Sequence, residues 1–289
     1  MVDVYEKIKE GERGAWVSII AYIVLSAVKL TIGYVFFSSA LRADGLNNLT
    51  DIVASIAVLI GLRISRKPPD HDHAYGHFRA ETVAALIASV IMAFIGLEVL
   101  VGAAQSLASG TEEAPQAWVA AVALGSAIVM YGVYRYNRDL SIKTNSQALM
   151  AAAKDNLSDA LVSIGAAIGI LGSQFGMPWL DVVTAFVVGL IICKTAWEIL
   201  SESLHRLTDG FDEKELDEIR QAIANVEGVE SVREIKARVN GSQTVLDVTI
   251  EVPRDLNIVE GHDIADRVEA EMKENHSIYF VSVHVEPAE

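Results

Sequence analysis

Six long stretches of mostly apolar residues fill the first two thirds of the chain and restrict its fold more than any other feature. A helix needs about 20 such residues to cross the hydrocarbon core of a bilayer. Backbone polar groups in lipid must be paired within the spanning segment, which favours helices over irregular structure. The sequence therefore predicts six transmembrane helices: Ala15–Phe37, Leu41–Ile64, Thr82–Ala108, Trp118–Tyr136, Ala148–Leu171 and Leu180–Leu200.

Lysine and arginine are distributed unevenly among the predicted loops. They occur before the first predicted helix and after the second and fourth, whereas the loops SGTEEAPQ and GSQFGMPW, after the third and fifth, contain none. Such residues accumulate on the cytoplasmic side of a membrane. We therefore predict a multi-pass protein of the cell membrane with both termini in the cytoplasm.

The last 80 or so residues have the composition of a small soluble domain. From Arg206 to Glu289 there are nine Lys and Arg against 20 Asp and Glu, which gives −11 of the chain's net charge of −15. This acidity argues against a nucleic-acid partner and suits a protein that handles cations, although it also serves simply to keep a domain soluble. A small core of this size gains stability from dimerisation.

The pattern of apolar residues in this tail predicts an α-β-β-α-β order, with Asn240-Gly241 as a hairpin turn. We therefore expect an α-helical membrane domain over residues 1–208 and a cytosolic α+β domain over residues 209–289. The predicted tail elements are helices over Asp212–Asn225 and Ile258–Met272 and strands over Val229–Val239, Thr244–Val252 and Ile278–Val285.

Two of the predicted membrane helices carry a similar polar pattern, LNNLTDIV in the second and KDNLSDAL in the fifth. In each, oxygen-bearing residues four positions apart lie on one face of the helix. Charged residues at membrane depth are costly and mark ion or proton paths. Asp51, Asp155 and Asp159 without basic neighbours would repel one another, and a divalent cation removes that conflict. The alternative is that these residues only join helices by hydrogen bonds.

A duplicated polar pattern of this kind is the expected geometry of a transporter. A membrane sensor or receptor that binds the ion without moving it is the alternative. An enzyme is not expected, because the sequence lacks a nucleophile-base set, a His-Glu-x-x-His zinc motif and a Gly-rich phosphate loop.

The ADGLNNLTD segment, the His-rich loop after the second helix, the KDNLSD segment and the α-β-β-α-β tail together resemble the cation diffusion facilitator family. The resemblance covers nearly the whole chain. It implies a homodimeric antiporter that exports divalent transition metals from the cytosol in exchange for protons. The transport site that it implies is formed by Asn47, Asp51, Asp155 and Asp159.

The resemblance also bears on the metal. Zinc-exporting members of the family usually have histidine at the position of Asp155, and this chain does not. Imidazole favours zinc, whereas carboxylate and amide oxygens favour harder ions such as Mn²⁺. Asn48 and Asn156, with water, are expected nearby to raise the coordination number. We therefore expect Mn²⁺ as the transported ion and no bound cofactor, with Fe²⁺, Zn²⁺ and Co²⁺ as alternatives.

Two further metal sites are implied by the resemblance. In the loop after the second helix, Asp70, His73 and His77 match a family site, with His71 and Asp72 as substitutes. The alternative is an ordinary polar turn. In the tail, we expect at most one weak site, and a plain structural role for its histidines is the preferred interpretation. The matching tail residues are His262, His284 and Glu286, while Arg233 and Thr249 replace two expected histidines.

Several charged residues remain outside these sites. Arg79 and Asp209 match a pair that forms a charge interlock in the family, although two independent charges are the simpler interpretation. Lys29 lies within a predicted span, and we leave open whether it pairs with Glu98 or extends toward the interface. Asp44 and Asp181 lie near helix ends, where capping is the simplest role.

Overall fold

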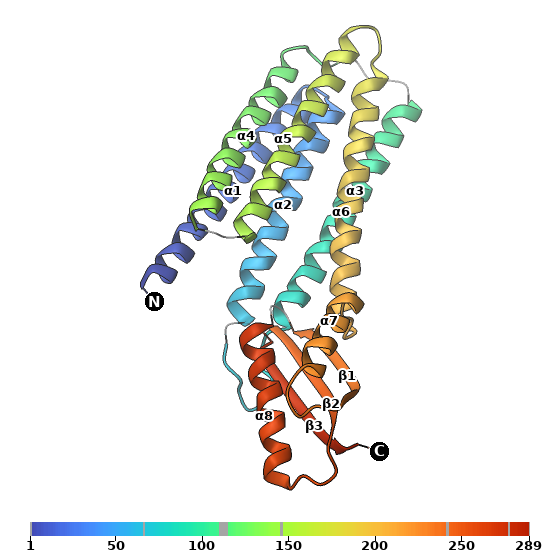
Figure 1. Ribbon diagram of the computed structural model, residues 1–289. Helices are drawn as coiled ribbons and strands as arrows, with labels where there is room; N and C mark the ends of the chain where they lie inside the picture. Colours follow the sequence, from blue (N-terminus) through green and yellow to red (C-terminus); the bar gives the residue numbers. More distant parts are fainter. Residues whose placement is uncertain are drawn as a thin grey trace. The chain divides into compact units, whose positions relative to one another are not determined.

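The structure is a computed structural model that describes residues 2–65, 67–109, 115–144, 147–240, 243–276 and 278–288. The chain divides into two units. The first unit comprises Met1–Ile56 and Ala88–Glu198, and the second comprises Ala57–Ile87 and Ile199–Glu289. Three long helices, α2, α3 and α6, contribute residues to both units (Figure 1).

Within the described ranges, six helices are long and apolar enough to cross a membrane, as the sequence predicted. Several are longer than the predicted spans because polar residues continue the helix beyond the apolar stretch. The acidic loop at residues 110–114, used in the sequence-based topology, lies outside the described residues. The six helices are α1 (Val2–Val35), α2 (Ser39–Ser65), α3 (Ala80–Ser109), α4 (Val119–Thr144), α5 (Gln147–Gln174) and α6 (Trp179–Leu207).

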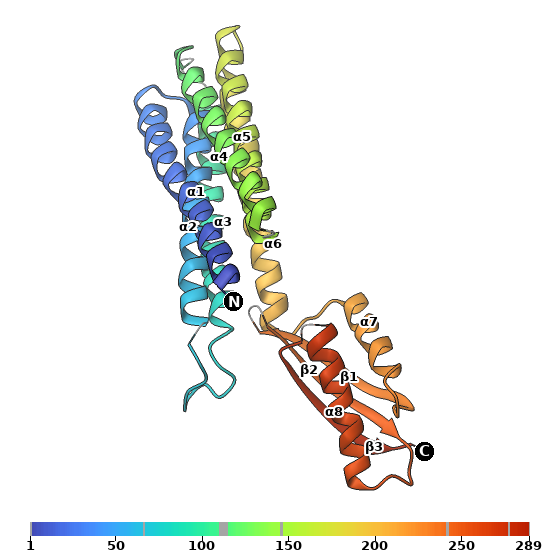
Figure 2. The ribbon, with the colours of Figure 1, turned by 60° about the vertical axis from the view of Figure 1, so that its left-hand side comes forward.

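Small residues allow the helices of the first unit to approach closely. Helix α4 packs against α5 and α1 (Figure 2), and fully buried alanines such as Ala123 and Ala166 lie in the cluster formed there. A second cluster, which includes Ala43 and Ala185, joins α2, α3 and α6. Van der Waals packing of small side chains is the main attraction between helices in lipid, where burial of apolar groups gives little gain. Packing of this kind positions the polar faces of α1, α2 and α5.

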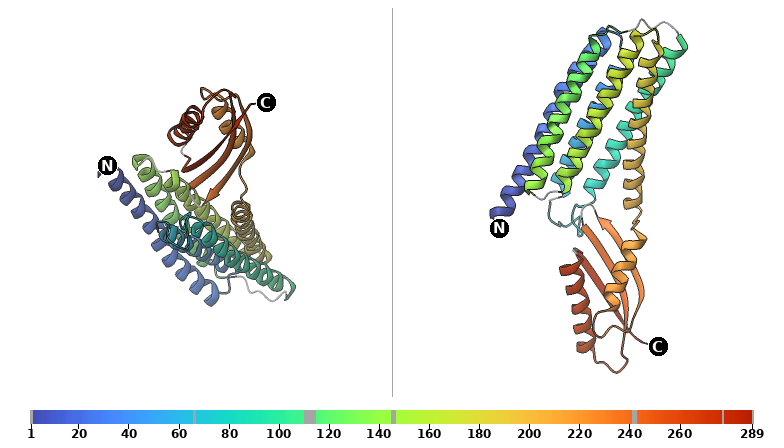
Figure 3. Two further views of the ribbon diagram at one scale, coloured as in Figure 1. Left: turned by 90° about the horizontal axis from the view of Figure 1, so that it is seen from below. Right: turned by 45° about the horizontal axis from the view of Figure 1, so that its top comes forward.

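The second unit contains a three-stranded sheet in the order β1-β2-β3, with helices packed against it (Figure 3). Strands β1 and β2 are antiparallel, and Asn240 lies opposite Gln243, as expected for the predicted hairpin; Gly241 of the turn lies outside the described residues. Strand β3 runs parallel to β2. The elements are α7 (Glu213–Ala224), β1 (Ser231–Asn240), β2 (Gln243–Val252), α8 (Ile258–Asn275) and β3 (Phe280–Pro287), in the predicted α-β-β-α-β order.

One apolar core holds this sheet and its two helices together. Ile223 of α7, Leu246 of β2 and Val268 of α8 are all fully buried in it. Each helix begins at a capping side chain: Asp212 accepts from the first turn of α7, and Asn257 forms a capping box at α8. These caps explain why the two helices begin close to the positions predicted from the sequence.

Candidate metal centre

The polar pairs of α2 and α5 meet in the first unit. Asn47 and Asp51 share one face of α2, and Asp155 and Asp159 share one face of α5, because residues four apart are neighbours on a helix. Nδ2 of buried Asn47 donates to Oδ1 of buried Asp159 over 2.9 Å. A carboxylate can only accept, so this bond turns the carbonyl oxygen of Asn47 away from Asp159 and leaves it available to a cation.

The two other carboxylates are placed differently. Oδ2 of Asp51 is buried and has no hydrogen-bond partner in the described part of the chain, whereas the side chain of Asp155 is exposed. The three aspartates do not form a set with ligand atoms all within 4.8 Å of one another. Ionised carboxylates repel, and a cation between them is what allows a closer approach. The two helices thus bring carboxylate and amide oxygens into the same part of the first unit.

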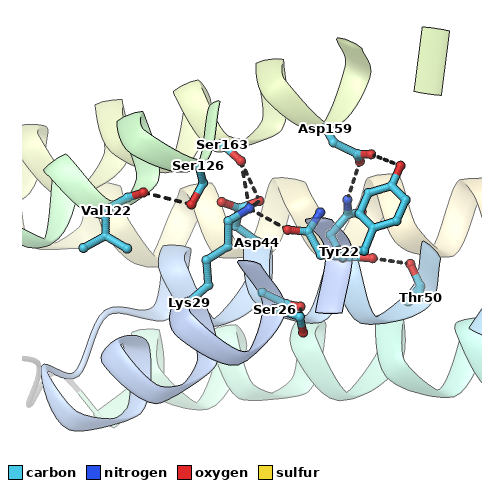
Figure 4. A network of polar contacts seen from close by, with 12 residues as sticks. Tyr22, Ser26, Lys29, Asp44, Thr50, Val122, Ser126, Asp159 and Ser163 are labelled. Atoms are coloured by element: carbon cyan, nitrogen blue, oxygen red, sulfur yellow. Dashed lines mark hydrogen bonds and ion pairs between the residues drawn. The ribbon is translucent and has the colours of Figure 1, made fainter. Parts of the chain in front are cut away.

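Helix α1 contributes a residue that the sequence reasoning missed. The hydroxyl of Tyr22 donates to Oδ2 of Asp159 over 2.8 Å and accepts from Nδ2 of Asn156 over 2.7 Å. Both oxygens of Asp159 therefore receive a hydrogen bond, one from α2 and one from α1 (Figure 4). Such bonds hold a metal ligand in one orientation.

Asn156 connects this cluster to two further helices. Its carbonyl oxygen accepts from Ser18 of α1 over 3.1 Å and from Asn137 of α4 over 2.9 Å. The expectation that Asn156 supplies an additional oxygen to the metal does not fit these contacts, because its oxygen has two donors and its amide nitrogen points to Tyr22. Asn156 acts instead as a bridge between α1, α4 and α5.

A second polar cluster lies beside the first. Nζ of Lys29 is fully buried and forms an ion pair of 2.9 Å with Oδ1 of Asp44. It also donates to Oδ1 of Asn48 over 2.7 Å and to Oγ of Ser163 over 2.9 Å (Figure 4). Lys29 thus pairs with Asp44 rather than with Glu98 or the interface. The expectation that Asp44 only caps a helix is wrong, and the oxygen of Asn48 is occupied.

Asp181 of α6 acts as a cap, although for another helix. Its carboxylate accepts from the hydroxyl of Ser38 over 2.9 Å and from the backbone nitrogens of Ser39 and Ala40 over 2.6 and 3.2 Å. These nitrogens belong to the start of α2, where helices leave donors without partners. Asp181 therefore anchors the beginning of the helix that carries Asn47.

The polar stripe on α1 is the signal that could have identified these residues in the sequence. Ser18, Tyr22, Ser26 and Lys29 recur at spacings of three and four in an otherwise apolar helix, and all four are buried. Residues at this spacing lie on one face. A buried polar face in a membrane helix needs polar partners, and the paired patterns of α2 and α5 are the partners present.

In the second unit, the loop between α2 and α3 brings three predicted ligands together. Oδ1 of Asp70 lies 3.0 Å from Nδ1 of His73, and Oδ2 lies 3.4 Å from Nε2 of His77. Their ligand atoms all lie within 4.8 Å of one another, a grouping that no other described His, Cys, Asp or Glu residues form. The hydrogen bond from the side chain of His73 is the main cause that lowers the pKa of Asp70. His71 and Asp72 do not join the group.

The predicted tail residues are not brought together in the same way. His262 on α8 lies 3.8 Å from Asp266, and His284 on β3 lies 3.6 Å from Glu286. Glu286 also forms an ion pair with Arg233. Within the described residues, His262, His284 and Glu286 form no three-ligand group.

The ion pair expected between Arg79 and Asp209 is present in the second unit. Nη2 of Arg79 lies 2.5 Å from Oδ1 of Asp209, and its Nε donates to Oδ1 of Asn240 over 3.0 Å. The guanidinium thus joins the loop before α3 to Asp209, two residues after the end of α6, and to the end of β1. This contact is structural and is not part of a metal site.

Comparison with known proteins identifies the family of the chain. Residues 15–208 match the family model described as the cation efflux transmembrane domain, and residues 211–288 match the cation efflux protein, cytoplasmic domain. The chain is 59% identical over 285 residues to the manganese efflux system protein MneS of Bacillus subtilis, covering 99% of this chain and 98% of that protein. It is 34% identical over 282 residues to the manganese efflux system protein MneP of the same organism, covering 94% of this chain and 95% of that protein.

Another relative, the uncharacterized transporter YdbO of Bacillus subtilis, is 53% identical over 282 residues, covering 98% of this chain and 97% of that protein. The matches extend over both the membrane helices and the tail. With six membrane helices and the polar cluster between α2 and α5, the chain is a multi-pass membrane protein that belongs to the cation diffusion facilitator family of cation efflux transporters, on its manganese-type branch.

Proposed function

We propose that the protein exports Mn²⁺ from the cytosol in exchange for protons, and that Asn47, Asp51, Asp155 and Asp159 bind the ion in transit. The hydrogen bond of 2.9 Å between Asn47 and Asp159 is the observation that carries this proposal. It joins polar residues of two membrane helices in one buried cluster, where carboxylates are costly unless they serve a cation or a proton. Membership of a cation efflux family supports a transport role for the cluster.

The chemistry of the four side chains favours Mn²⁺. They offer only carboxylate and amide oxygens, which suit hard divalent ions better than the imidazole and thiolate ligands preferred by zinc. The names of MneS and MneP, which describe manganese efflux, support the same choice. Fe²⁺, Zn²⁺ and Co²⁺ remain the competing substrates to include in any assay.

Proton exchange follows from the use of carboxylates as ligands. A carboxylate binds metal in its ionised form, so metal and protons compete for the same oxygens. Oδ2 of Asp51 is buried and has no donor among the residues that the structure describes, and either a metal ion or a proton satisfies such an atom. We infer that protons taken up on the outer side displace the ion. The uneven distribution of Lys and Arg supports cytoplasmic termini, and membership of a cation efflux family supports export as the direction of transport.

We further infer that the chain works as a homodimer and that Asp70, His73 and His77 bind a metal ion on the cytoplasmic side. The small apolar core of the C-terminal fold supports dimerisation, because a core of about 80 residues is marginal alone. The grouping of one carboxylate and two imidazoles within 4.8 Å supports the loop site. The tail residues His262, His284 and Glu286 lack such a grouping, and we keep the structural interpretation for them.

Reconstituted vesicles provide the direct test. The purified protein is placed in sealed proteoliposomes that are acidic inside, and Mn²⁺ or Zn²⁺ is offered outside while a trapped dye reports metal and a second dye reports protons. We expect Mn²⁺ uptake coupled to proton release, and its loss in Asp159→Asn. Asp139→Asn provides the matched control, because Asp139 lies on the exposed surface of α4, outside the cluster.

The alternatives give different results. Binding of Mn²⁺ without flux in the unmodified protein contradicts transport and supports a membrane sensor. Zn²⁺ uptake without Mn²⁺ uptake preserves the transporter but refutes the choice of ion. Full activity in Asp159→Asn means that the ion uses another path.

A further inference from the structure

The ammonium group of Lys29 occupies a cage of oxygens inside the first unit. Its three hydrogen-bond partners are Oδ1 of Asp44, Oδ1 of Asn48 and Oγ of Ser163, at 2.9, 2.7 and 2.9 Å. These match the three donors of an ammonium group. The side chains of Lys29 and Asp44 have no exposed surface, so their charges are removed from water and depend on each other.

The oxygens of this cage are of the kinds that bind a divalent metal. One carboxylate, one amide carbonyl and one hydroxyl are ligands that hard cations accept. Within the described ranges, Oδ2 of Asp44 is buried and has no donor, so the carboxylate has a further oxygen to offer. Without Lys29, this cage would present a negative charge and several neutral oxygens to a cation.

The cage adjoins the proposed transport site along two helices. Asp44 precedes Asn47 by three residues on α2, and Ser163 follows Asp159 by four residues on α5, so each pair shares a helix face. On α1, Tyr22 and Lys29 are seven residues apart, which again places them on one face. An ion at the transport site therefore lies one helical turn from an alternative set of oxygens, and Lys29 occupies that set.

Lys29 also determines which way Asn48 presents its amide group. An ammonium only donates, so the atom of Asn48 that faces it is the carbonyl oxygen. The amide nitrogen is left buried and has no hydrogen-bond partner among the described residues. A donor in this position cannot bind a cation.

We propose that Lys29 is a positioning residue that keeps the transported ion at the carboxylates of Asp51, Asp155 and Asp159 by occupying the oxygen cage of Asp44, Asn48 and Ser163. Its ammonium serves as a tethered cation that restricts each protomer to one ion in this part of the path. This inference rests on the proposed function in one respect, which is that the transported ion binds at Asp51, Asp155 and Asp159.

The test is the number of Mn²⁺ ions bound by the purified full-length protein. Equilibrium dialysis with elemental analysis compares the unmodified protein with Lys29→Met, Lys29→Gln and Lys29→Arg, all of which have the same loop and tail. We expect Lys29→Met and Lys29→Gln to bind about one additional Mn²⁺ per protomer, because a carboxylate cage without its cation accepts a divalent ion. Lys29→Arg retains a cation and should bind as the unmodified protein does.

Two double variants separate this proposal from its alternatives. Lys29→Met with Asp44→Asn removes the charge of the cage and should return the count to that of the unmodified protein. Lys29→Met with Asp159→Asn should lose the transport-site ion and keep the additional one. In Lys29→Met with Asp159→Asn, loss of the additional ion while the other ion is kept would overturn the present proposal, whereas an unchanged count would overturn the proposed transport site. In Lys29→Met with Asp44→Asn, a count that stays one ion higher than in the unmodified protein would also overturn the present proposal.

Folding provides a second measurement. If Mn²⁺ replaces the ammonium, it should raise the thermal midpoint of Lys29→Met more than that of the unmodified protein, and it should rescue the variant when present during purification. A folded Lys29→Met or Lys29→Gln that binds the original number of ions overturns the proposal. So does a variant that fails to fold even with Mn²⁺ throughout, because Mn²⁺ then does not take the place of Lys29.

Discussion

Replacing Tyr22 with phenylalanine tests whether α1 is part of the metal centre. The change removes one hydroxyl, which donates to Asp159 over 2.8 Å and accepts from Asn156 over 2.7 Å. A hydrogen bond to a charged group contributes about 1.5–3 kcal/mol. The donated bond stabilises the ionised carboxylate, which is the form that binds metal, and a carboxylate has enough lone pairs to accept it while bound to an ion. Its loss should therefore weaken Mn²⁺ binding.

The expected weakening follows from these values. At about 1.4 kcal/mol for each factor of ten, the dissociation constant for Mn²⁺ should rise by up to about 150-fold. The upper limit applies when the free Asp159 takes up a proton in the variant, since the bond is also present without the ion. The fold should lose about 1–3 kcal/mol in addition, because Nδ2 of Asn156 is left buried without an acceptor. Thermal unfolding measures this second effect separately from binding.

The assay is Mn²⁺ titration of the protein in nanodiscs by calorimetry, together with the concentration dependence of transport in vesicles. Tyr34→Phe is the matched control, since Tyr34 lies on the same helix and is 56% exposed. Unchanged affinity in Tyr22→Phe, with the same decrease in thermal stability, would refute the reasoning and leave Tyr22 as a structural residue only. Equal losses of Mn²⁺ affinity in Tyr22→Phe and Tyr34→Phe would show that any change in α1 weakens binding, and that the bond to Asp159 is not the cause.

Three further predictions follow from the same contacts. Asp155→His should shift uptake toward Zn²⁺ in competition with Mn²⁺, because imidazole favours zinc, and unchanged selectivity in the vesicle assay would argue against Asp155 as a ligand. Asp181→Ala should destabilise the protein by about 2 kcal/mol through loss of the cap on α2, measured as a lower thermal midpoint against Asp139→Ala. Metal binding by the loop should weaken in Asp70→Asn and not in Asp72→Asn, because the hydrogen bond from His73 lowers the pKa of Asp70 and keeps this ligand ionised, whereas Asp72 lies outside the group of three ligands. Co²⁺ absorbance in an Asp159→Asn background reports loop binding, and equal effects of the two loop variants would contradict this prediction.

The fold follows closely from the sequence because its signals are local. Six apolar stretches of sufficient length can only be helices in a membrane, and the caps at Asp212 and Asn257 mark where α7 and α8 begin. The last strand is less well determined. The sequence left open which face of this strand is inward; in the structure Ile278 precedes the strand, Val281 is buried and Phe280 is 48% exposed. A one-residue shift reverses the face of every side chain, and the packing against α8 decides it.

The metal centre could be predicted only in part. The i, i+4 spacing on α2 and α5 identifies residues that share a helix face, but it gives no information about the rotation of a third helix. The contacts of Tyr22 with Asp159 and of Lys29 with Asp44 depend on how α1 packs, and neither follows from spacing within one segment. Asp181 likewise caps a helix that begins 142 residues earlier. Such contacts require the tertiary structure.

The charges of the two clusters suggest why α1 is needed at all. Lys29 offsets Asp44 within its own cage, so Asp51, Asp155 and Asp159 remain as the three carboxylates of the proposed transport site. Two of their charges are matched by the ion, and the third requires stabilisation from neutral groups or from a proton. Asp159 is the carboxylate that receives such help, since Asn47 and Tyr22 each donate a hydrogen bond to it. In the proposed transport site, helix α1 thus supplies both the cation that fills the neighbouring cage and a hydrogen-bond donor to the third carboxylate.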